Sequence, residues 1–596
     1  MKVRVSDFIA QYIANNGITD VFTITGGGAM YLNDSFGHCK GLKCYYQHHE
    51  QACAIAAESY ARINNKLALV CVTTGPGGTN AITGVVGGWL DSVPMLVISG
   101  QVRSDTMARN SGVDIRAMGD QEFDITTISS KMTKYSELVE DPNRILYCLH
   151  KAIVVATNGR PGPCWLDIPL DIQGAFIETD GLLDFNPQEY INTLPLNIDT
   201  QTIDLIINKI KVSKRPILYA GNGIRLSKGY DLFLKLIELL NIPVVTNWDS
   251  IDLIPTNHPL YVGRPGNMGD RAGNFAVQNS DLVLSIGSRL SIRQTGFNWD
   301  TWARNAYVIM EDVCEGELHK PNLHVDMPLH VDAKALLNKM VETLTEPLEI
   351  KTQWVNRCRE WKEKYPVALP KYRSSKGLVN PYHFIDTISR KLSDNSITVV
   401  GNGTACVVGS QAYYIKKNSR FIINSAVASM GYDLPAAIGA HVASRKEIIN
   451  ITGDGSIMMN LQELQTIVTN SLPVKIFLLN NEGYQSIRIT QTNLFDSNYV
   501  GIGPDSKDLS FPSFEKIANA FGIPYYRIDS NENLDLLNNI LNKDGYLICE
   551  VFIDKGQFFE PKSATKKLPD GSLYSPPLED MAPFLPREEF EENMRK

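Results

Sequence analysis

The stretch that decides the fold runs from Ile451 to Tyr484 and reads ITGDGSIMMNLQELQTIVTNSLPVKIFLLNNEGY. An apolar run ends at Gly453-Asp454-Gly455, a helical segment follows, and a second apolar run ends at Asn480-Asn481. The 27 positions from Asp454 to Asn481 leave room for one helix and one strand. The pattern predicts a βαβ unit whose two strand ends lie side by side at the carboxyl edge of a parallel sheet.

These strand ends predict a site for a hard cation that holds a diphosphate. Such cations prefer oxygen ligands, and Asp454, Asn481 and the backbone carbonyl of Gly483 supply them. The glycines let the backbone approach closely, so Gly453, Gly455 and Ser456 are expected to contact the diphosphate. GDG or NN alone is a common turn, and two ordinary turns are the structural alternative. Their combination at this spacing favours the cation site.

A second carboxylate completes the predicted site. Glu50 follows Gln47-His48-His49 and opens an alanine-rich segment of strong helix formers, ACAIAAESYAR. Alone, it reads equally well as an acid that stabilises the positive end of a helix dipole. With the distant cation motif in the same chain, the catalytic interpretation is favoured.

The rest of the chain repeats the alternation of strand and helix. Short β-branched runs alternate with helical patterns, which predicts three doubly wound parallel-sheet domains of the α/β class. Irregular segments at 176–198 and 347–378 separate blocks of typical domain size. From Gly556 onward, many prolines exclude long regular elements and predict an ordered tail over another surface, with a disordered tail as the alternative.

Seven stretches spread over nearly the whole chain resemble acetolactate synthases, which use thiamine diphosphate. They are VFTITGGGAM, HHEQACAIAAESYAR, TTGPGGTNAITGVVGGWLDSVPMLVISGQV, GRPGPCWLDIPLDIQ, SDLVLSIGSRL, ASMGYDLPAAIGA and GDG…NNEGY. The resemblance implies a pyrimidine-binding domain (1–175), a central domain (195–345), a diphosphate-binding domain (375–555) and a C-terminal tail (556–596). It implies the cofactors thiamine diphosphate and Mg²⁺. It also implies a homodimer or a dimer of dimers, because in this family two subunits share each site.

The same resemblance assigns further residues. Glu50 and Gln121 match catalytic residues of the family, the first at the aminopyrimidine ring and the second close to the reaction intermediate. Gly27 and Gly28 match glycines at the cofactor. Two further matches are Met430, the apolar residue beneath the cofactor, and Lys134, a lysine near the flavin or substrate channel. An ordinary core methionine is compatible with the Met430 assignment, and Gln121 or Lys134 could instead be surface polar residues.

The chain departs from acetolactate synthases at the acceptor side. Asp120 in GDQE replaces an aromatic residue, Asn267 replaces a methionine, and Thr490 replaces a tryptophan, while Arg293 matches an arginine that holds the acceptor carboxylate. The loss of two aromatic residues predicts a larger and more polar pocket. The donor side remains as in acetolactate synthases, so pyruvate is the expected donor. The polar acceptor side makes a keto-deoxysugar nucleotide the expected acceptor, with Arg293 pairing with phosphate. The ending LPDGSLYSPPLEDMAPFLPREEF also resembles acetolactate synthase-like enzymes of polysaccharide pathways that add an acetyl branch to a keto-sugar nucleotide. Plain acetolactate synthase remains the alternative.

Two residues of the central domain indicate a flavin, and three other functions are considered. Arg289 and Asp312 match flavin-contacting regions of the family, which implies FAD as a further cofactor. Pyruvate decarboxylases share the cofactor signature but carry a pair of histidines well beyond the glutamate. Residues 103–135 of this chain contain no histidine, so simple aldehyde release is disfavoured. A non-catalytic homologue would have lost Glu50 or a metal ligand, and an NAD enzyme would need a third glycine after Gly221-Asn222-Gly223.

Composition excludes several other classes of partner. The 65 acidic and 57 basic residues give a net charge of -8, and the basic residues are scattered, so nucleic acid is not an expected partner. The first residues lack the apolar core of a secretory signal, and no apolar run is long enough for a membrane span. Ten single cysteines without a CxxC pair fit a reducing cytoplasm, which is the expected location.

Overall fold

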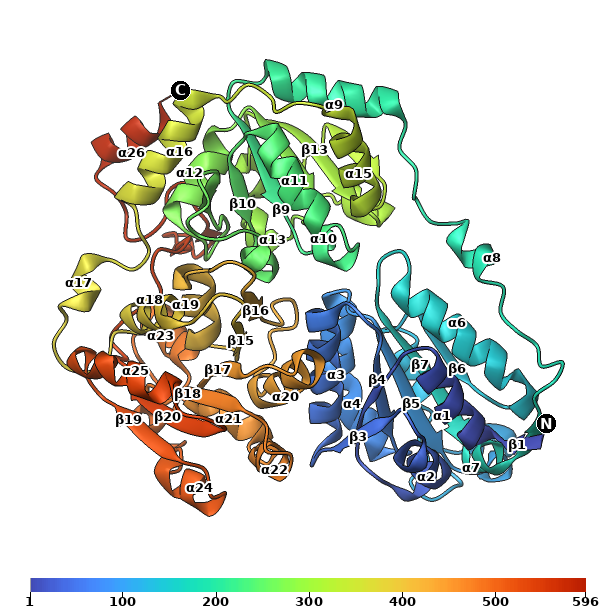
Figure 1. The fold of residues 1–596 in the computed structure, drawn as a ribbon. Helices are drawn as coiled ribbons and strands as arrows, with labels where there is room; N and C mark the ends of the chain where they lie inside the picture. The colour runs from blue at the N-terminus through green and yellow to red at the C-terminus, as the bar shows by residue number, and fades with distance from the viewer. Residues whose placement is uncertain (1, 596) are drawn as a thin grey trace.

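A computed structural model describes residues 2–595, and its core consists of three six-stranded parallel sheets with helices on both faces (Figure 1). The predicted class of three doubly wound α/β domains is therefore confirmed. Each sheet has long buried strands at its centre, as expected where helices cover both faces of a parallel sheet.

The first sheet has the strand order β3-β2-β4-β5-β7-β6, and all its pairs are parallel. Its strands are β2 (Asp20–Thr23), β3 (Lys43–Tyr46), β4 (Ala68–Val72), β5 (Met95–Gln101), β6 (Tyr135–Leu138) and β7 (Pro163–Pro169). Helices α1 (Val5–Asn15) and α6 (Ile145–Thr157) cover one face, and α3 (Glu50–Asn64) and α4 (Pro76–Leu90) cover the other.

The central sheet has the order β11-β10-β9-β12-β13-β14 and is also parallel. Its strands are β9 (Pro216–Ala220), β10 (Val244–Thr246), β11 (Tyr261–Gly263), β12 (Leu282–Ile286), β13 (Tyr307–Asp312) and β14 (Met327–His330). The strand order reverses between β9 and β12. At such a switch point the neighbouring connections diverge and leave a crevice at the carboxyl ends of the strands.

The third sheet has the order β16-β15-β17-β18-β20-β19. Its strands are β15 (Ile397–Val400), β16 (Arg420–Ile422), β17 (Ile448–Gly453), β18 (Val474–Asn480), β19 (Tyr525–Ile528) and β20 (Leu547–Phe552). β17 and β18 pair in parallel, with Thr452 opposite Leu478 and Gly453 opposite Leu479. Helix α22 (Glu463–Thr469) lies between them in the sequence, which is the βαβ unit that the Ile451–Tyr484 stretch predicts.

The first and third domains share one continuous apolar core. Helix α3 packs along α20 (Asp433–Ser444), and residues of both helices belong to a single buried cluster that extends into both sheets (Figure 1). The helices approach so closely that a Cβ atom at Gly439 would lie 1.9 Å from the carbonyl oxygen of Ala56. Glycine at this position therefore sets the distance between the two helices.

The end of the chain returns to the central domain. Helix α26 (Arg587–Met594) lies against α12 (Arg271–Asn279) and α16 (Thr352–Lys364), as the red helix beside the yellow-green ones in Figure 1 shows. The Trp361 ring nitrogen donates to Asn593 Oδ1 at 2.9 Å, and buried Glu579 forms an ion pair with Arg304 at 2.6 Å. The proline-rich tail is thus held by specific polar contacts.

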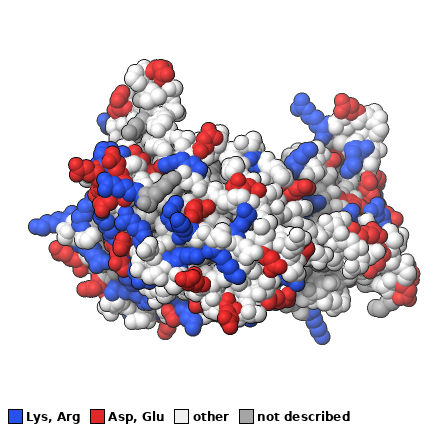
Figure 2. Space-filling model, turned by 90° about the horizontal axis from the view of Figure 1, so that it is seen from above, with Lys and Arg blue, Asp and Glu red and all other residues white. Residues whose placement is uncertain are grey.

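The surface charge is mixed, and the described helices are not suited to crossing a membrane. Basic and acidic side chains intermingle over the face that Figure 2 shows. Within residues 2–595, no helix combines the length and the apolar character needed to cross a bilayer.

Candidate active site and cofactor crevice

A cavity of about 320 Å³ lies at the carboxyl ends of β15, β17 and β18. The structure brings seven of the sequence-predicted residues together in its wall: Met430, Gly453, Asp454, Gly455, Ser456, Asn481 and Gly483. The spacing argument works because two parallel neighbours end at the same sheet edge. Their positions in the fold therefore gather a set of oxygen donors around one space.

Asp454 is the charged group of this cavity. Its carboxylate accepts from the backbone amides of Gly455 at 2.8 Å and Gly483 at 2.9 Å, and the side chain is almost fully buried. Burial raises the pKa of Asp454 to about 7, although the neighbouring amides favour the charged form. A buried carboxylate of this kind is strongly stabilised by a bound cation.

The other oxygen donors are held by their own partners. Asn481 donates through Nδ2 to Thr404 Oγ1 at 3.2 Å, so Oδ1 is the atom left to act as a ligand. Gly483 has φ +138°, and a Cβ there would lie 1.8 Å from the Ile502 carbonyl oxygen, so only glycine fits. Among the described residues there is no cluster of three His, Cys, Asp or Glu for a metal. A cation here would rely on one carboxylate, one amide and one carbonyl oxygen.

Several lining residues were not found from the sequence. Asn402, Gly403 and Thr404 line the cavity at the end of β15, and Gly403 has φ +81° with open space where a Cβ would be. Their signal was the short GNGT turn directly after the apolar run 397–400. Arg488 of α23 (Gln485–Leu494) was also missed. It lies behind the cavity and donates to the carbonyls of Asn481 and Glu482 at 3.3 and 2.9 Å. It fixes the loop that carries the ligands.

Met430 and Ser456 connect the cavity to α20. Ser456 Oγ donates to the buried Asp433 carboxylate at 2.5 Å and accepts from the Gly431 amide at 3.0 Å. The segment that contains Met430 is therefore fastened to the loop after β17, and Met430 lies in the cavity wall.

The predicted pyrimidine-side residues lie at the carboxyl edge of the first sheet. Glu50 is the first residue of α3 and accepts from Asn80 Nδ2 of α4 at 3.0 Å. Gln121 lies against Gly75, where a Cβ would be 2.3 Å from the Gln121 carbonyl oxygen. The loop with Gly27 and Gly28 follows β2 at the same edge.

Within one chain, these groups do not line the Asp454 cavity. The start of α3 instead contacts the third domain beside that cavity, where Asn460 Nδ2 donates to Gln51 Oε1 at 2.9 Å. The two halves of the predicted site therefore remain apart in the single chain.

The acceptor-side residues form one pair and two separate positions. The backbone N–H of Asn267 donates to the backbone carbonyl of Arg293 at 3.0 Å, and the Arg293 guanidinium lies 4.9 Å from the ring centre of Trp248. Asn267 Oδ1 is buried without a hydrogen-bond partner. Asp120 and Thr490 are exposed on other elements, and no hydrogen bond or ion pair among residues 2–595 joins them to this pair.

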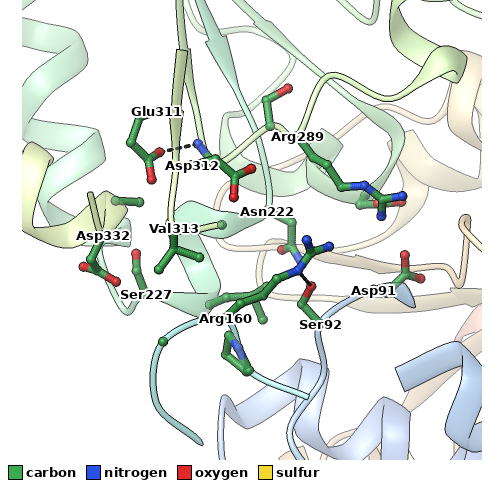
Figure 3. A pocket seen from close by; sticks show the side chains of 18 of the residues that line it. Asp91, Ser92, Arg160, Asn222, Ser227, Arg289, Glu311, Asp312, Val313 and Asp332 are labelled. Carbon is green, nitrogen blue, oxygen red and sulfur yellow. Dashed lines mark hydrogen bonds between the residues drawn. The ribbon is translucent and has the colours of Figure 1, made fainter. Parts of the chain in front are cut away.

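A second site is the crevice at the β9/β12 switch point. Its lining includes Asn222, Arg289 and Asp312 from the central domain and Asp91, Ser92 and Arg160 from the first domain (Figure 3). Arg289 and Asp312 are thus brought together as the sequence predicts. The contribution of Arg160 was missed, because no local pattern indicates that the loop after α6 reaches the central domain.

Acidic side chains outnumber basic ones in the lining of this crevice, which includes Asp91, Asp249, Glu311, Asp312 and Asp332 with Arg160 and Arg289. Glu317 contacts Arg160 at 3.0 Å, Arg289 at 3.3 Å and Lys320 at 2.9 Å. Burial raises the pKa of Glu317, but the surrounding cations outweigh it and hold the pKa below its usual value. The guanidinium groups of Arg160 and Arg289 suit a phosphate group, whereas the buried carboxylate of Asp312 suits ribose hydroxyls.

Lys134 does not line this crevice. Its ammonium donates to the Asn158 carbonyl at 2.7 Å and lies over the Tyr190 ring, and burial lowers its pKa to about 8. It supports the 158–162 loop that carries Arg160.

Three family models match the chain, described as the N-terminal thiamine pyrophosphate binding domain (residues 3–128), the central domain (203–340) and the C-terminal thiamine pyrophosphate binding domain (401–551) of thiamine pyrophosphate enzymes. An acetolactate synthase large subunit from Cyanidium caldarium is 31% identical over 94% of both chains. A chloroplastic acetolactate synthase 3 from Brassica napus is 31% identical over 92% of this chain and 83% of its own. A large subunit from Lactococcus lactis is 30% identical over 93% of both.

Proposed function

This chain belongs to the acetolactate synthase-like family of thiamine diphosphate-dependent enzymes, and on that basis we propose that it decarboxylates pyruvate and transfers the two-carbon acyl unit to a carbonyl acceptor. The observation that carries the proposal is the cavity at the ends of β17 and β18. It combines a buried carboxylate, an amide oxygen and a glycine-lined wall in one space.

Asp454, Asn481 and the Gly483 carbonyl would hold Mg²⁺, and the backbone at Gly453, Gly455 and Gly403 would receive the diphosphate. The open space at Gly453 and Gly403, where a Cβ would meet nothing, supports this assignment. When bound, thiamine diphosphate supplies a carbon acid and an electron sink for the decarboxylation. Glu50 would hold a proton at the aminopyrimidine ring.

A homodimer is the proposed minimal unit, with a dimer of dimers as its extension. Glu50 and Gln121 lie at one sheet edge and the Asp454 cavity at another, and one chain does not join them. A second copy would complete each site, as it does in the family that the sequence resembles. The assignments of residues 1–175, 195–345 and 375–555 to pyrimidine, central and diphosphate domains belong to this proposal.

The proposed acceptor is a polar carbonyl compound, in particular a keto-deoxysugar nucleotide. Asn267 supports it, because a buried amide oxygen without a partner favours a ligand that can donate a hydrogen bond. The Arg293 guanidinium would pair with a phosphate, and Asp120 and Thr490 add polar groups in place of aromatic ones. The relatives are named acetolactate synthases, so condensation of two 2-keto acids is the second candidate.

FAD is the proposed ligand of the central crevice. Arg160 and Arg289 would face its diphosphate, and Asp312 would accept from the ribose (Figure 3). The crevice lies at the topological switch point where such sheets bind dinucleotides.

A competition assay tests the acceptor. Pyruvate is supplied together with 2-ketobutyrate, simple aldehydes and nucleotide-linked 4-keto sugars, and products are followed by mass. We expect the highest kcat/KM with a keto sugar, and Thr490→Trp should raise acetolactate formation at the expense of that larger acceptor. Thr490→Ser, which keeps the hydroxyl bonded to the Ser486 carbonyl, is the matched control. Pyruvate self-condensation at or above the rate with every keto sugar would return the enzyme to plain acetolactate synthase.

A further inference from the structure

A fully buried carboxylate lies in the first domain outside the residues assigned so far. Asp167 on β7 is 1% exposed and has no cation among its hydrogen-bond partners. Its Oδ1 accepts from Ser99 Oγ at 2.5 Å, and its Oδ2 accepts from Gln101 Nε2 at 2.9 Å. Burying a carboxyl group is costly unless it is hydrogen-bonded. Its role therefore lies in what it holds in place.

Gln101, at the end of β5, has partners for every side-chain polar atom. Its Oε1 accepts from Thr74 Oγ1 at 2.7 Å and from the Val102 amide at 2.9 Å. Its Nε2 donates both to Asp167 and to the Phe123 carbonyl at 2.8 Å. One buried amide thus joins the strand ends to the segment that follows Gln121.

The loop before Phe123 is fixed from its other side as well. The Glu122 carboxylate accepts from the amides of Ala108 at 2.6 Å, Met118 at 2.7 Å and Gly119 at 3.0 Å. Gln121 between these anchors has φ +60°, a conformation that side-chain-bearing residues rarely adopt. Its carbonyl also lies against Gly75, next to Thr74.

We propose that Gln101, held by Asp167, is a positioning residue that fixes the 119–123 loop and so sets the side chain of Gln121 against the cofactor site. The inference rests on the proposed function, in which Gln121 contacts the reacting groups. Neither Gln101 nor Asp167 reaches a ligand, because both are buried among strands. Their contribution is the geometry of a loop that otherwise has exposed residues on both sides of Gln121.

A pair of isosteric changes separates anchoring from stability. Asp167→Asn keeps an oxygen for Gln101 Nε2 and offers an NH₂ to Ser99 Oγ, so the anchor survives. Adding Gln101→Glu lets the two new side chains pair with each other but leaves the Phe123 carbonyl facing an oxygen. The double variant therefore restores the buried pair and removes only the loop anchor.

The assay is release of CO₂ from pyruvate by the complete enzyme with added thiamine diphosphate and Mg²⁺. We expect Asp167→Asn to keep most of kcat/KM and the double variant to lose about 10²-fold, the effect of a displacement near 1 Å at a reacting group. Thiamine diphosphate affinity should change little. Asp20→Asn is the control, because Asp20 is a buried carboxylate of the same sheet, at the start of β2, where it pairs with Arg445 at 2.7 Å and does not contact the 119–123 loop. Wild-type kcat/KM in the double variant would overturn the proposal.

Coupling to Gln121 is the decisive measurement. In a Gln121→Ala background the double variant should cause no further loss, since the loop then has nothing to position. A further loss of similar size would show that Gln101 acts elsewhere. If Gln121→Ala alone is fully active, the catalytic role of Gln121 fails instead. Amide hydrogen exchange of residues 119–123 in Asp167→Ala, expected to be faster than in the wild type, decides the anchoring independently, and unchanged exchange would refute it.

Discussion

Gly439→Ala should weaken the contact between the first and third domains. A Cβ there would lie 1.9 Å from the Ala56 carbonyl oxygen, whereas carbon and oxygen normally approach to about 3.3 Å. Helix α3 or α20 must therefore move by roughly 1.4 Å, because the obstacle is backbone and not a flexible side chain. Overpacking of this kind costs about 1–3 kcal/mol, and alanine's better helix propensity returns up to about 1 kcal/mol. We expect a net loss near 2 kcal/mol.

For domains of this size, that loss lowers Tm by about 4–8 °C, which calorimetry of the complete enzyme can resolve. Activity should fall as well, because α3 begins at Glu50 and the shift displaces that carboxylate. Gly316→Ala is the matched control, since a Cβ there meets no atom within 4 Å. A Gly439→Ala protein as stable and as active as the wild type would refute the reasoning.

Three further predictions concern the cofactor and the buried acids. Glu50→Gln should bind thiamine diphosphate but lose at least ~10²-fold in turnover, and mixing it with Asp454→Ala should restore activity in hybrid dimers; absence of rescue after verified subunit exchange would contradict a shared site. Burial raises the pKa of Asp167 to about 7 from near 3.9 in the unfolded chain, so its stabilising effect is full below pH 4 and is lost as the pH rises through 7. Asp167→Asn should therefore raise the free energy of unfolding, relative to the wild type, more at pH 8 than at pH 5, and denaturant titrations with identical pH slopes would count against this. Arg160→Ala should weaken FAD retention about tenfold or more, through loss of a charge-assisted contact, as judged by flavin absorbance after desalting, with Arg304→Ala as control; undiminished retention would exclude Arg160 from the site.

The sequence predicted the parts of the site that depend on local order. Asp454 and Asn481 could be paired because a βαβ unit has one geometry, in which consecutive parallel strands end together. Gln101 and Asp167 could not be found this way. Each reads as part of a strand, and only the register of β5 and β7, with Ser99 opposite Asp167 and Gln101 two positions further along, brings them within hydrogen-bond distance.

The lining of the crevice at the β9/β12 switch point could also be predicted only in part from the sequence. Arg289 follows β12 and Asp312 ends β13 of the same sheet, whereas Arg160 comes from another domain and its place depends on how the two domains dock. The packing of the C-terminal tail against α12 and α16 likewise depends on surfaces formed by residues far away in the sequence.

Because α3 and α20 share one core, the domains that pack most closely together are not the ones that are adjacent in the sequence. The first and third domains share one apolar cluster, while the central domain, which lies between them in sequence, has clusters of its own and reaches the core of the third domain through Trp248 and Ile251. The C-terminal tail packs against the central domain and is held there by the Trp361–Asn593 and Arg304–Glu579 contacts. Part of each segment expected to be irregular is regular, since α16 (Thr352–Lys364) lies within 347–378 and α8 (Pro187–Ile191) within 176–198. A nick in the remaining connections, at 192–198 or 365–369, would therefore cut the polypeptide without separating the shared core that carries Glu50 and Asp454.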